Sequence, residues 1–226
     1  MASKDQLTQF KYGILASALL CILFCTFAFP VQAYAKVNSN SIPDLNTFIE
    51  TVKDGNASTL RGVYVPNVMA LAIVQQPMGN PGYVSTTESV ATQFSIATEV
   101  GNVGLLAHNT AAGSFFSNIK SGDRIVLVYG DGHLESFMAK SIQRYQALNP
   151  LSPYSQFSDL EAQTKFSAEE LFNKVYRGEY HLTLQTCIEN NGNASWGRLF
   201  ILADPVENSG KSVNTLALLS NKKHID

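Results

Sequence analysis

From residue 62 onward the chain consists of short β-like runs separated by turn residues, and this pattern restricts the fold more than any other feature of the sequence. The runs are rich in Val, Ile, Tyr and Phe, which favour strands. About eight short strands around one core predict a mostly β protein whose sheet closes into a barrel with few, short helices. The predicted strands are Gly62–Pro66, Met69–Gln75, Gln93–Ala97, Gly104–Ala107, Arg124–Tyr129, Leu134–Tyr145, Tyr180–Thr186 and Arg198–Ala203.

Local signals predict one tight hairpin and a first helix. The glycines of Gly130-Asp131-Gly132 suit a tight turn with positive φ, so the strands on either side of this turn are expected to pair. A helix is expected over Ile42–Asp54, where apolar residues recur at helical spacing. Ser41 is its expected N-cap, and Pro43 is acceptable in its first turn.

A second helix is predicted late in the β region. Ser167-Ala168-Glu169-Glu170 has the form of a capping box, and Phe166 and Leu171 are spaced as a hydrophobic staple around it. The helix is expected to stop at Gly178, which suits the C′ position. The stretch before it, Asn149–Lys165, contains two prolines and several serines and is predicted as a loop.

Residues 1–35 have the composition of a targeting segment. A short charged stretch is followed by an uncharged, largely apolar run, then by Pro30 and by Ala33-Tyr34-Ala35, which has the small-x-small form of a signal-peptidase site. The apolar run is long for a signal peptide and short for a membrane span, so a cleaved signal and a retained anchor both stay open, with cleavage slightly preferred. Either way, the rest of the chain is expected to be exported.

These signals divide the chain into four parts. They are a signal peptide or membrane anchor (1–35), a linker with a short helix (36–61), the β-barrel domain (62–205) and a polar C-terminal tail (206–226). The net charge is −2, so no surface for binding a polyanion is indicated and nucleic acid is not an expected partner.

Cysteine usage singles out Cys187. The other two cysteines lie in the targeting segment, so the exported domain has a single thiol and cannot form an internal disulfide. Cys187 is therefore a buried core residue, an intermolecular link or a reactive thiol. The residues before it alternate as a strand does, which puts it at or just beyond a strand end. A polar turn follows, and a hairpin of that form brings Arg198 beside Cys187, where a cation activates a thiol.

The segment Thr183-Leu184-Gln185-Thr186-Cys187 resembles the TLxTC signature of sortases, the enzymes that attach exported proteins to bacterial cell walls or to one another. Arg198 matches the arginine that the family carries on the next strand, and His108 matches its upstream histidine. His108 is followed by Phe115-Phe116 and by Ile119-Lys120-Ser121-Gly122-Asp123-Arg124-Ile125, which is also similar to the family's pattern. The resemblance spans about residues 60–205 and implies a sortase-like β-barrel.

The resemblance implies a cysteine transpeptidase, and the chemistry of the residues agrees with it. Cys187 is the expected nucleophile, His108 the group that protonates the leaving amine, and Arg198 the donor to the oxyanion. Thr186 is expected to contribute a substrate or oxyanion contact. The partners implied are an exported protein with a C-terminal sorting motif and an amine acceptor, which is a peptidoglycan precursor or a protein subunit. The membrane is a further partner if the N-terminal segment is not cleaved.

Two features depart from the family's usual pattern. Ala107 and Asn109 flank the histidine, where the family often has glycine before it and arginine or another polar residue after it. The stretch from Leu148 to Tyr180 is long and carries its own helix in the region of the substrate-facing loop. These departures concern the class of sortase and the motif that it recognises.

No cofactor and no metal site are predicted. One cysteine and scattered histidines give no pair of ligands at zinc spacing. Some sortases bind calcium near the substrate loop, and four acidic residues lie in that region, but capping and solvation of the helix are preferred as their role. These residues are Asp159, Glu161, Glu169 and Glu170.

Several alternatives remain. The same fold could act as an exported cysteine protease if water replaces the amine, or as a non-catalytic barrel that binds a peptide. An L,D-transpeptidase is disfavoured, because its signature has glycine before the cysteine and an arginine close behind it. His181 is a rival base if its strand stays regular, whereas His133 is expected to be an exposed hairpin residue and His224 a solvated one.

Overall fold

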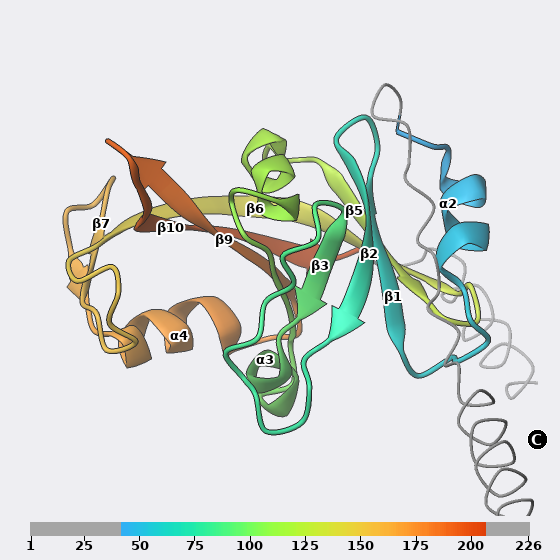
Figure 1. Ribbon diagram of the computed structural model, residues 1–226, viewed down its shortest axis with the longest axis horizontal. Helices are drawn as coiled ribbons and strands as arrows, with labels where there is room; N and C mark the ends of the chain where they lie inside the picture. Colours follow the sequence, from blue (N-terminus) through green and yellow to red (C-terminus); the bar gives the residue numbers. More distant parts are fainter. Residues whose placement is uncertain (1–41, 207–226) are drawn as a thin grey trace, which may run out of the picture. The chain divides into compact units, whose positions relative to one another are not determined.

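The computed structural model describes residues 42–206, so the predicted targeting segment and all but the first residue of the C-terminal tail lie outside the described part. Strands β10, β9, β4, β3, β2, β1, β5 and β6 are neighbours in that order, and β6 pairs back onto β10 (Figure 1). This pairing closes a barrel of eight strands. The mostly β fold with a closed barrel and short helices, predicted from the sequence, is confirmed.

Seven of the eight barrel strands correspond to predicted runs, with boundaries that differ by a few residues, whereas β3 shares only Gln93 with the run predicted there. Strands β7 and β8 extend the sheet from β6 outside the closed ring. The bounds are β1 Leu60–Val65, β2 Met69–Gln75, β3 Val90–Gln93, β4 Val103–Leu106, β5 Arg124–Tyr129, β6 Leu134–Ala147, β7 Phe157–Asp159, β8 Lys165–Phe166, β9 Leu182–Asn190 and β10 Asn193–Pro205.

The barrel encloses the main hydrophobic core. Because side chains alternate along a strand, every second residue of β9 points inward, starting from Leu182 and Leu184, which are fully buried. Their neighbours Thr183 and Gln185 point outward, where the Thr183 hydroxyl donates to the carbonyl oxygen of Val175 and the Tyr176 hydroxyl donates to Gln185 Oε1. Cys187 continues this outward series.

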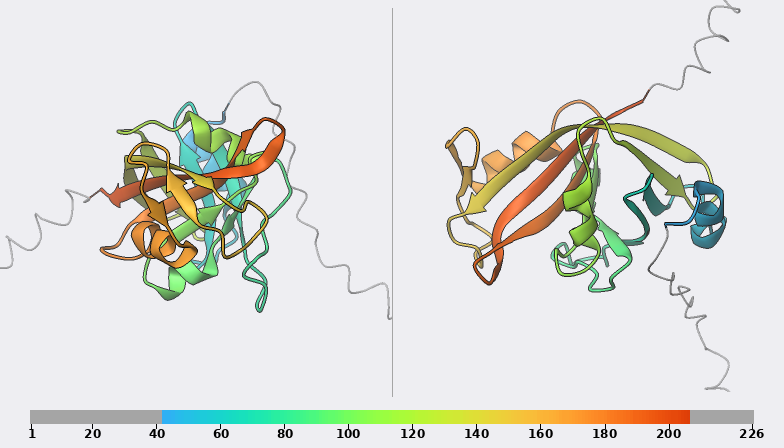
Figure 2. Two further views of the ribbon diagram at one scale, coloured as in Figure 1. Left: turned by 90° about the vertical axis from the view of Figure 1, so that its left-hand side faces the viewer. Right: turned by 90° about the horizontal axis from the view of Figure 1, so that it is seen from above.

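A second, aromatic cluster covers the outer face of β4, β9, β10 and β6. It packs between this face and the helices α3 (Ser95–Glu99) and α4 (Ala168–Tyr176), and β7 and β8 also contribute to it. Both views in Figure 2 keep α4 alongside β9 and β10. Its buried members are Ala97, Tyr145, Ala147, Phe157, Leu171, Val175, Tyr176 and Phe200. The outer face that carries Cys187 is therefore partly covered by packed structure.

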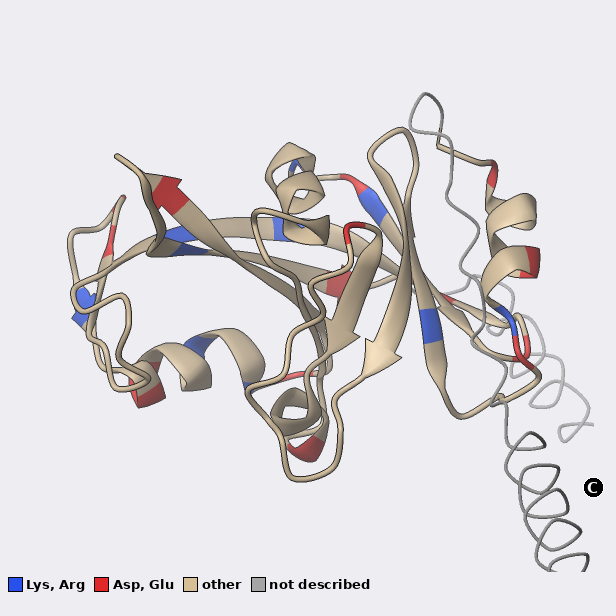
Figure 3. Ribbon diagram, in the orientation of Figure 1, with Lys and Arg blue, Asp and Glu red and all other residues tan. Residues whose placement is uncertain are grey.

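The helix α4 begins as the sequence predicts. Ser167 Oγ accepts from the Glu170 amide and the Glu170 carboxylate accepts from the Ser167 amide, which completes the capping box. The hydrogen bond from the Ser167 backbone amide to the carboxylate, followed by the interaction with the Ser167 side chain, holds the pKa of Glu170 below its usual value. Figure 3 shows the acidic first turn and the basic residue further along this helix, an order that suits the helix dipole.

The first helix is shorter than expected. Helix α2 spans Leu45–Val52 and packs Phe48 against Tyr64 and the outer side of β5. Its N-cap is Asp44, whose carboxylate accepts from the Thr47 amide at 3.1 Å. The predicted N-cap Ser41 lies outside the described residues. Because Asp44 supplies the cap, Ile42 and Pro43 precede the helix.

Two predictions about the secondary structure between strands are wrong. The run predicted as the strand 93–97 leaves the sheet at Gln93, because the amide and hydroxyl of Ser95 both donate to Gln76 Oε1 and Phe94 packs against Tyr176 instead. The stretch 149–165 is not all loop, since β7 pairs with β6 there and β8 follows. A 3-10 helix, η1 (Ala112–Asn118), was not predicted. Within residues 42–206, no helix has the length and apolar character needed to cross a membrane.

Candidate functional site

The β9–β10 hairpin brings Cys187 and Arg198 together. Its turn is the pair Asn191-Gly192, and both residues have positive φ, as a two-residue turn between twisted strands requires. Strand β9 continues to Asn190, so Cys187 lies within the strand and the polar turn is shorter than the sequence suggested. In the register of the two strands Cys187 is directly opposite Arg198. Residues that are directly opposite in an antiparallel pair share a face of the sheet.

His108 reaches the same place from the other side of β9. Strand β4 runs parallel to β9 with Leu106 level with Gln185, and the Ala107 amide donates to the Gln185 carbonyl oxygen at 3.2 Å. Continued by two residues, this register puts His108 level with Cys187. Adjacent strands lie about 4.8 Å apart, so this extension of the ladder, whose last pair is Leu106 with Gln185, places His108 in line with Cys187 and Arg198. We call these three residues the site row.

A buried contact fixes the end of β4 against β9. Thr186 points away from Cys187 into the barrel, is 4% exposed and donates from Oγ1 to the Ala107 carbonyl oxygen at 2.8 Å. The next carbonyl, that of His108, accepts from the amides of Ala111 and Gly113, each at 2.9 Å. The backbone on both sides of His108 is therefore hydrogen-bonded. The substrate or oxyanion contact expected of Thr186 stays a prediction; in this structure its hydroxyl has a protein partner.

The guanidinium of Arg198 is held by its own strand. Nη1 donates to the carbonyl oxygens of Ser195 and Gly197, each at 2.9 Å, and the guanidinium carbon lies 6.0 Å from the ring centre of Phe157. A guanidinium has five N–H donors, so those of Nε and Nη2 are left to meet a ligand. Within residues 42–206, no carboxylate forms an ion pair with Arg198. The arrangement holds the guanidinium in place on the strand position directly opposite Cys187.

The Ser195 carbonyl is available because β10 bulges. The register is interrupted between the pairs Asn193–Asn190 and Gly197–Ile188, so residues 194–196 face the single residue Glu189. A bulge turns backbone groups out of the ladder. The Ala194 carbonyl oxygen accepts from the side-chain amide of Asn109 at 2.9 Å, a contact between residues 85 positions apart.

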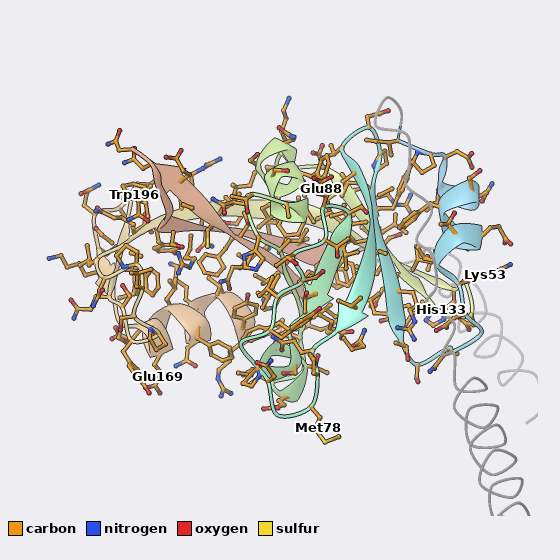
Figure 4. The ribbon with its side chains drawn as sticks, viewed as in Figure 1. Lys53, Met78, Glu88, His133, Glu169 and Trp196 are labelled. Carbon is orange, nitrogen blue, oxygen red and sulfur yellow. The ribbon has the colours of Figure 1, made fainter. Side chains whose placement is uncertain are left out.

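The other described histidines lie elsewhere. His181 is 8% exposed, with Nδ1 at 2.7 Å from the Glu179 carbonyl oxygen and Nε2 at 3.0 Å from that of Val175. Six residues of strand separate it from Cys187, or about 20 Å. The structure therefore contradicts the alternative in which His181 is the base. His133 lies at the far end from the labelled Trp196 of β10 (Figure 4), stacked on Tyr129 with ring centres 4.1 Å apart.

The acidic residues considered for calcium have other partners or stand apart. Asp159 Oδ1 accepts from the amides of Glu161 and Ala162, and Glu170 belongs to the capping box. Among residues 42–206, no group of three His, Cys, Asp or Glu side chains is arranged to hold a metal ion.

Sequence analysis missed three residues that shape the site: Gly113, Phe157 and the role of Asn109. Gly113 gives no signal because a close backbone approach is invisible in the sequence. Phe157 lies on β7, a strand that was not predicted. Asn109 was noted only as a departure from a family pattern.

No protein-family model matches the chain, and no curated protein matches it. Among solved structures, its fold is similar to Listeria monocytogenes sortase A at 15% identity and a TM-score of 0.43, with 68% of this chain and 89% of that chain covered. It is also similar to sortase C-1 from Actinomyces oris at 13% identity and a TM-score of 0.45, with 74% and 83% covered. A Clostridium perfringens sortase D5 transpeptidase matches at 13% identity and a TM-score of 0.43, with 72% and 86% covered. At these scores the likeness by itself carries no argument about what the chain does.

Proposed function

We propose that the chain is an exported, sortase-like cysteine transpeptidase. The observation that supports this proposal is the pair of strand registers behind the site row: β10 sets Arg198 opposite Cys187, and the β4–β9 register, extended two residues past Leu106, leads to His108 at the same level. Acyl transfer needs a nucleophile, a proton donor for the leaving amine and a donor to the oxyanion, and the row contains one residue suited to each.

In the first half of the reaction, the Cys187 thiolate attacks the carbonyl carbon of a peptide bond in the substrate. The oxyanion that forms accepts hydrogen bonds from the free N–H groups of Arg198. As the C–N bond breaks, the His108 imidazolium gives its proton to the departing amine. The acyl group remains on Cys187 as a thioester.

In the second half, an amine attacks the thioester carbonyl. His108, now neutral, takes a proton from this amine, and the C–S bond breaks to release the thiolate and a new amide. If water attacks instead, the product is a free carboxylate and the enzyme acts as a protease. The acyl donor proposed is an exported protein with a C-terminal sorting motif, and the acceptor an amine of a cell-wall precursor or of another protein. Both the donor and the acceptor lie outside the cytoplasmic membrane, where residues 1–35 are proposed to direct the chain.

The first test measures how Cys187 reacts with iodoacetamide. The full-length chain is alkylated across a range of pH and the labelled Cys187 peptide is quantified by mass spectrometry, which keeps Cys21 and Cys25 out of the measurement. We expect labelling faster than that of a free peptide thiol near neutral pH and a changed pH profile in His108→Ala. His133→Ala is the matched control, because His133 lies at the other end of the barrel. Labelling no faster than that of a free thiol, with no effect of His108→Ala, would contradict the proposal.

The second test addresses Arg198 and the overall reaction. Arg198→Lys keeps the charge but loses the planar fork of donors, so we expect acyl transfer to fall by at least tenfold while the thiol stays reactive toward iodoacetamide. C-terminally trimmed exported proteins, compared by mass spectrometry between cells with the wild-type chain and cells with Cys187→Ala, identify the substrates. Termini joined to an amine indicate transfer, and free carboxylates indicate hydrolysis.

A further inference from the structure

The bulge in β10 holds both partners of Cys187 through two consecutive carbonyl groups. The Ala194 carbonyl accepts from Asn109, the residue next to His108, and the Ser195 carbonyl accepts from Arg198. Two segments on opposite sides of Cys187 are thereby tied to one short piece of backbone. The bulge lies between the pairs Gly197–Ile188 and Asn193–Asn190, and none of residues 194–196 belongs to a buried core cluster, so the core packing of the barrel does not require this arrangement.

The contact made by Asn109 joins the loop after β4 to β10, two parts of the chain that β9 separates in the sheet. Strand β4 ends at Leu106, and its last hydrogen bond to β9 is made by Ala107. Beyond that point, the Asn109 side chain bonds to β10 directly. This hydrogen bond, which we call the tie, therefore joins the two segments that lie on either side of β9, the strand that carries Cys187.

We infer that Asn109 is a positioning residue for His108. Its amide ties the His108 loop to the β10 bulge, and so sets the distance of the imidazole from Cys187 and from the guanidinium of Arg198. This inference rests on the proposed function. Catalytic groups that are displaced by as little as an ångström lose much of their effect, so a tie at this place affects chemistry more than folding.

The backbone around His108 leaves a role for such a tie. The Thr186 hydroxyl and the Gly113 amide fix the carbonyls of Ala107 and His108, but both contacts end on backbone carbonyls and neither involves the His108 side chain. Asn109 is the first side chain after His108, and it donates rather than accepts. A carboxylate at position 109 keeps the shape of the side chain and loses the donor.

The test uses three variants of the full-length chain. Asn109→Ala removes the tie without adding charge, and Asn109→Asp removes the donor and adds a negative charge. Asn193→Asp is the control, because Asn193 Oδ1 accepts from the Ser195 amide and a carboxylate still accepts, so this variant adds the same charge to the hairpin that Asn109 contacts and keeps its hydrogen bond. His108→Ala is measured alongside.

The readout is the pH profile of Cys187 alkylation by iodoacetamide, followed on the Cys187 peptide. We expect Asn109→Ala to move the profile in the direction of His108→Ala and to lower the rate near neutral pH roughly two- to tenfold, the range set by one net hydrogen bond. Asn193→Asp is expected to stay within about twofold of wild type at the same pH, since its hydrogen bond is kept. Hydrogen exchange of the amides in residues 193–197 is expected to become faster in Asn109→Ala.

Two results would overturn the inference alone. The first is a wild-type profile for Asn109→Ala together with a shifted profile for His108→Ala, even if hydrogen exchange is faster, because the tie is then only structural. The second is an equal shift in Asn193→Asp and Asn109→Asp together with no shift in Asn109→Ala, because charge alone then explains the change. A wild-type profile for His108→Ala would instead remove the proposed function, and this inference with it.

Discussion

Replacing Gly113 by alanine tests the packing that supports the His108 backbone. A Cβ at this position would overlap Thr186 Oγ1 and would lie 2.6 Å from the Ala107 carbonyl oxygen and 2.7 Å from that of His108. Real Cβ contacts essentially never fall under 3.0 Å. Two of the three neighbours are backbone carbonyls that take part in the β4–β9 junction, so no flexible side chain can simply move aside.

The expected cost follows from these contacts. Overpacking of a well-packed site costs about 1–3 kcal/mol. Displacing Thr186 also breaks its hydrogen bond to Ala107, worth about 1 kcal/mol. We therefore expect Gly113→Ala to lower the free energy of unfolding by about 2–4 kcal/mol. For a domain of this size that corresponds to a fall in Tm of roughly 5–15 °C.

Thermal and urea unfolding followed by circular dichroism measure this cost. The matched control is Gly82→Ala, because the nearest atom to a Cβ there is 3.8 Å away and the backbone is not left-handed. The control is expected to change stability by less than about 0.5 kcal/mol. A double-mutant cycle with Thr186→Ala then isolates the clash with Oγ1. The double variant should lose less stability than the sum of the losses in the two single variants.

The result that refutes this reasoning is a Gly113→Ala variant whose Tm matches that of Gly82→Ala. If Gly113→Ala lowers the free energy of unfolding by the same amount when Thr186 is already alanine, the strain lies at the two carbonyl oxygens and not at Oγ1. Alkylation of Cys187 in Gly113→Ala, measured well below its Tm, adds a functional readout. We expect it to be slower than in wild type, because His108 is carried by the backbone that must shift.

Two further predictions concern Arg198 and the capping box. Phe157→Leu removes the ring that faces the guanidinium, so the ratio of Cys187 alkylation by anionic iodoacetate to that by iodoacetamide should fall by about twofold or more. Phe166→Leu, a change in the neighbouring packing that leaves this contact intact, should keep the ratio; equal ratios in both variants would argue against the contact. The lowered pKa of Glu170 means that its carboxylate stabilises the fold above the unfolded pKa of about 4.3, and that this contribution is lost as the pH falls through the folded value. Glu170→Gln should therefore show a smaller fall of Tm than wild type on acidification, and parallel curves would contradict this assignment.

Much of the barrel could be predicted because its signals are local. Val, Ile and aromatic enrichment marks each strand, and the capping box around Ser167 is complete within four residues. The turn glycines of 130–132 likewise specify the β5–β6 hairpin, whose pairing is observed. Failures came where tertiary contacts overrode local preference. Phe94 and Ala97 look like strand residues, yet they turn into α3 because the aromatic cluster under α4 buries them.

The candidate site likewise has features that the sequence predicts and features that only the tertiary structure shows. The sequence by itself determined which residues are available: one thiol in the barrel domain, an arginine across a hairpin and a histidine upstream. Only the tertiary structure decided that β4 lies beside β9 in a parallel register that leads toward His108, on the side of β9 away from Arg198. The Thr186–Ala107 contact that holds this register joins residues 79 positions apart. The sequence also did not determine the bulge whose carbonyls accept from Asn109 and Arg198. A bulge is defined by the pairing of two strands, and the extra residues of β10 can be recognised only once their register with β9 is known.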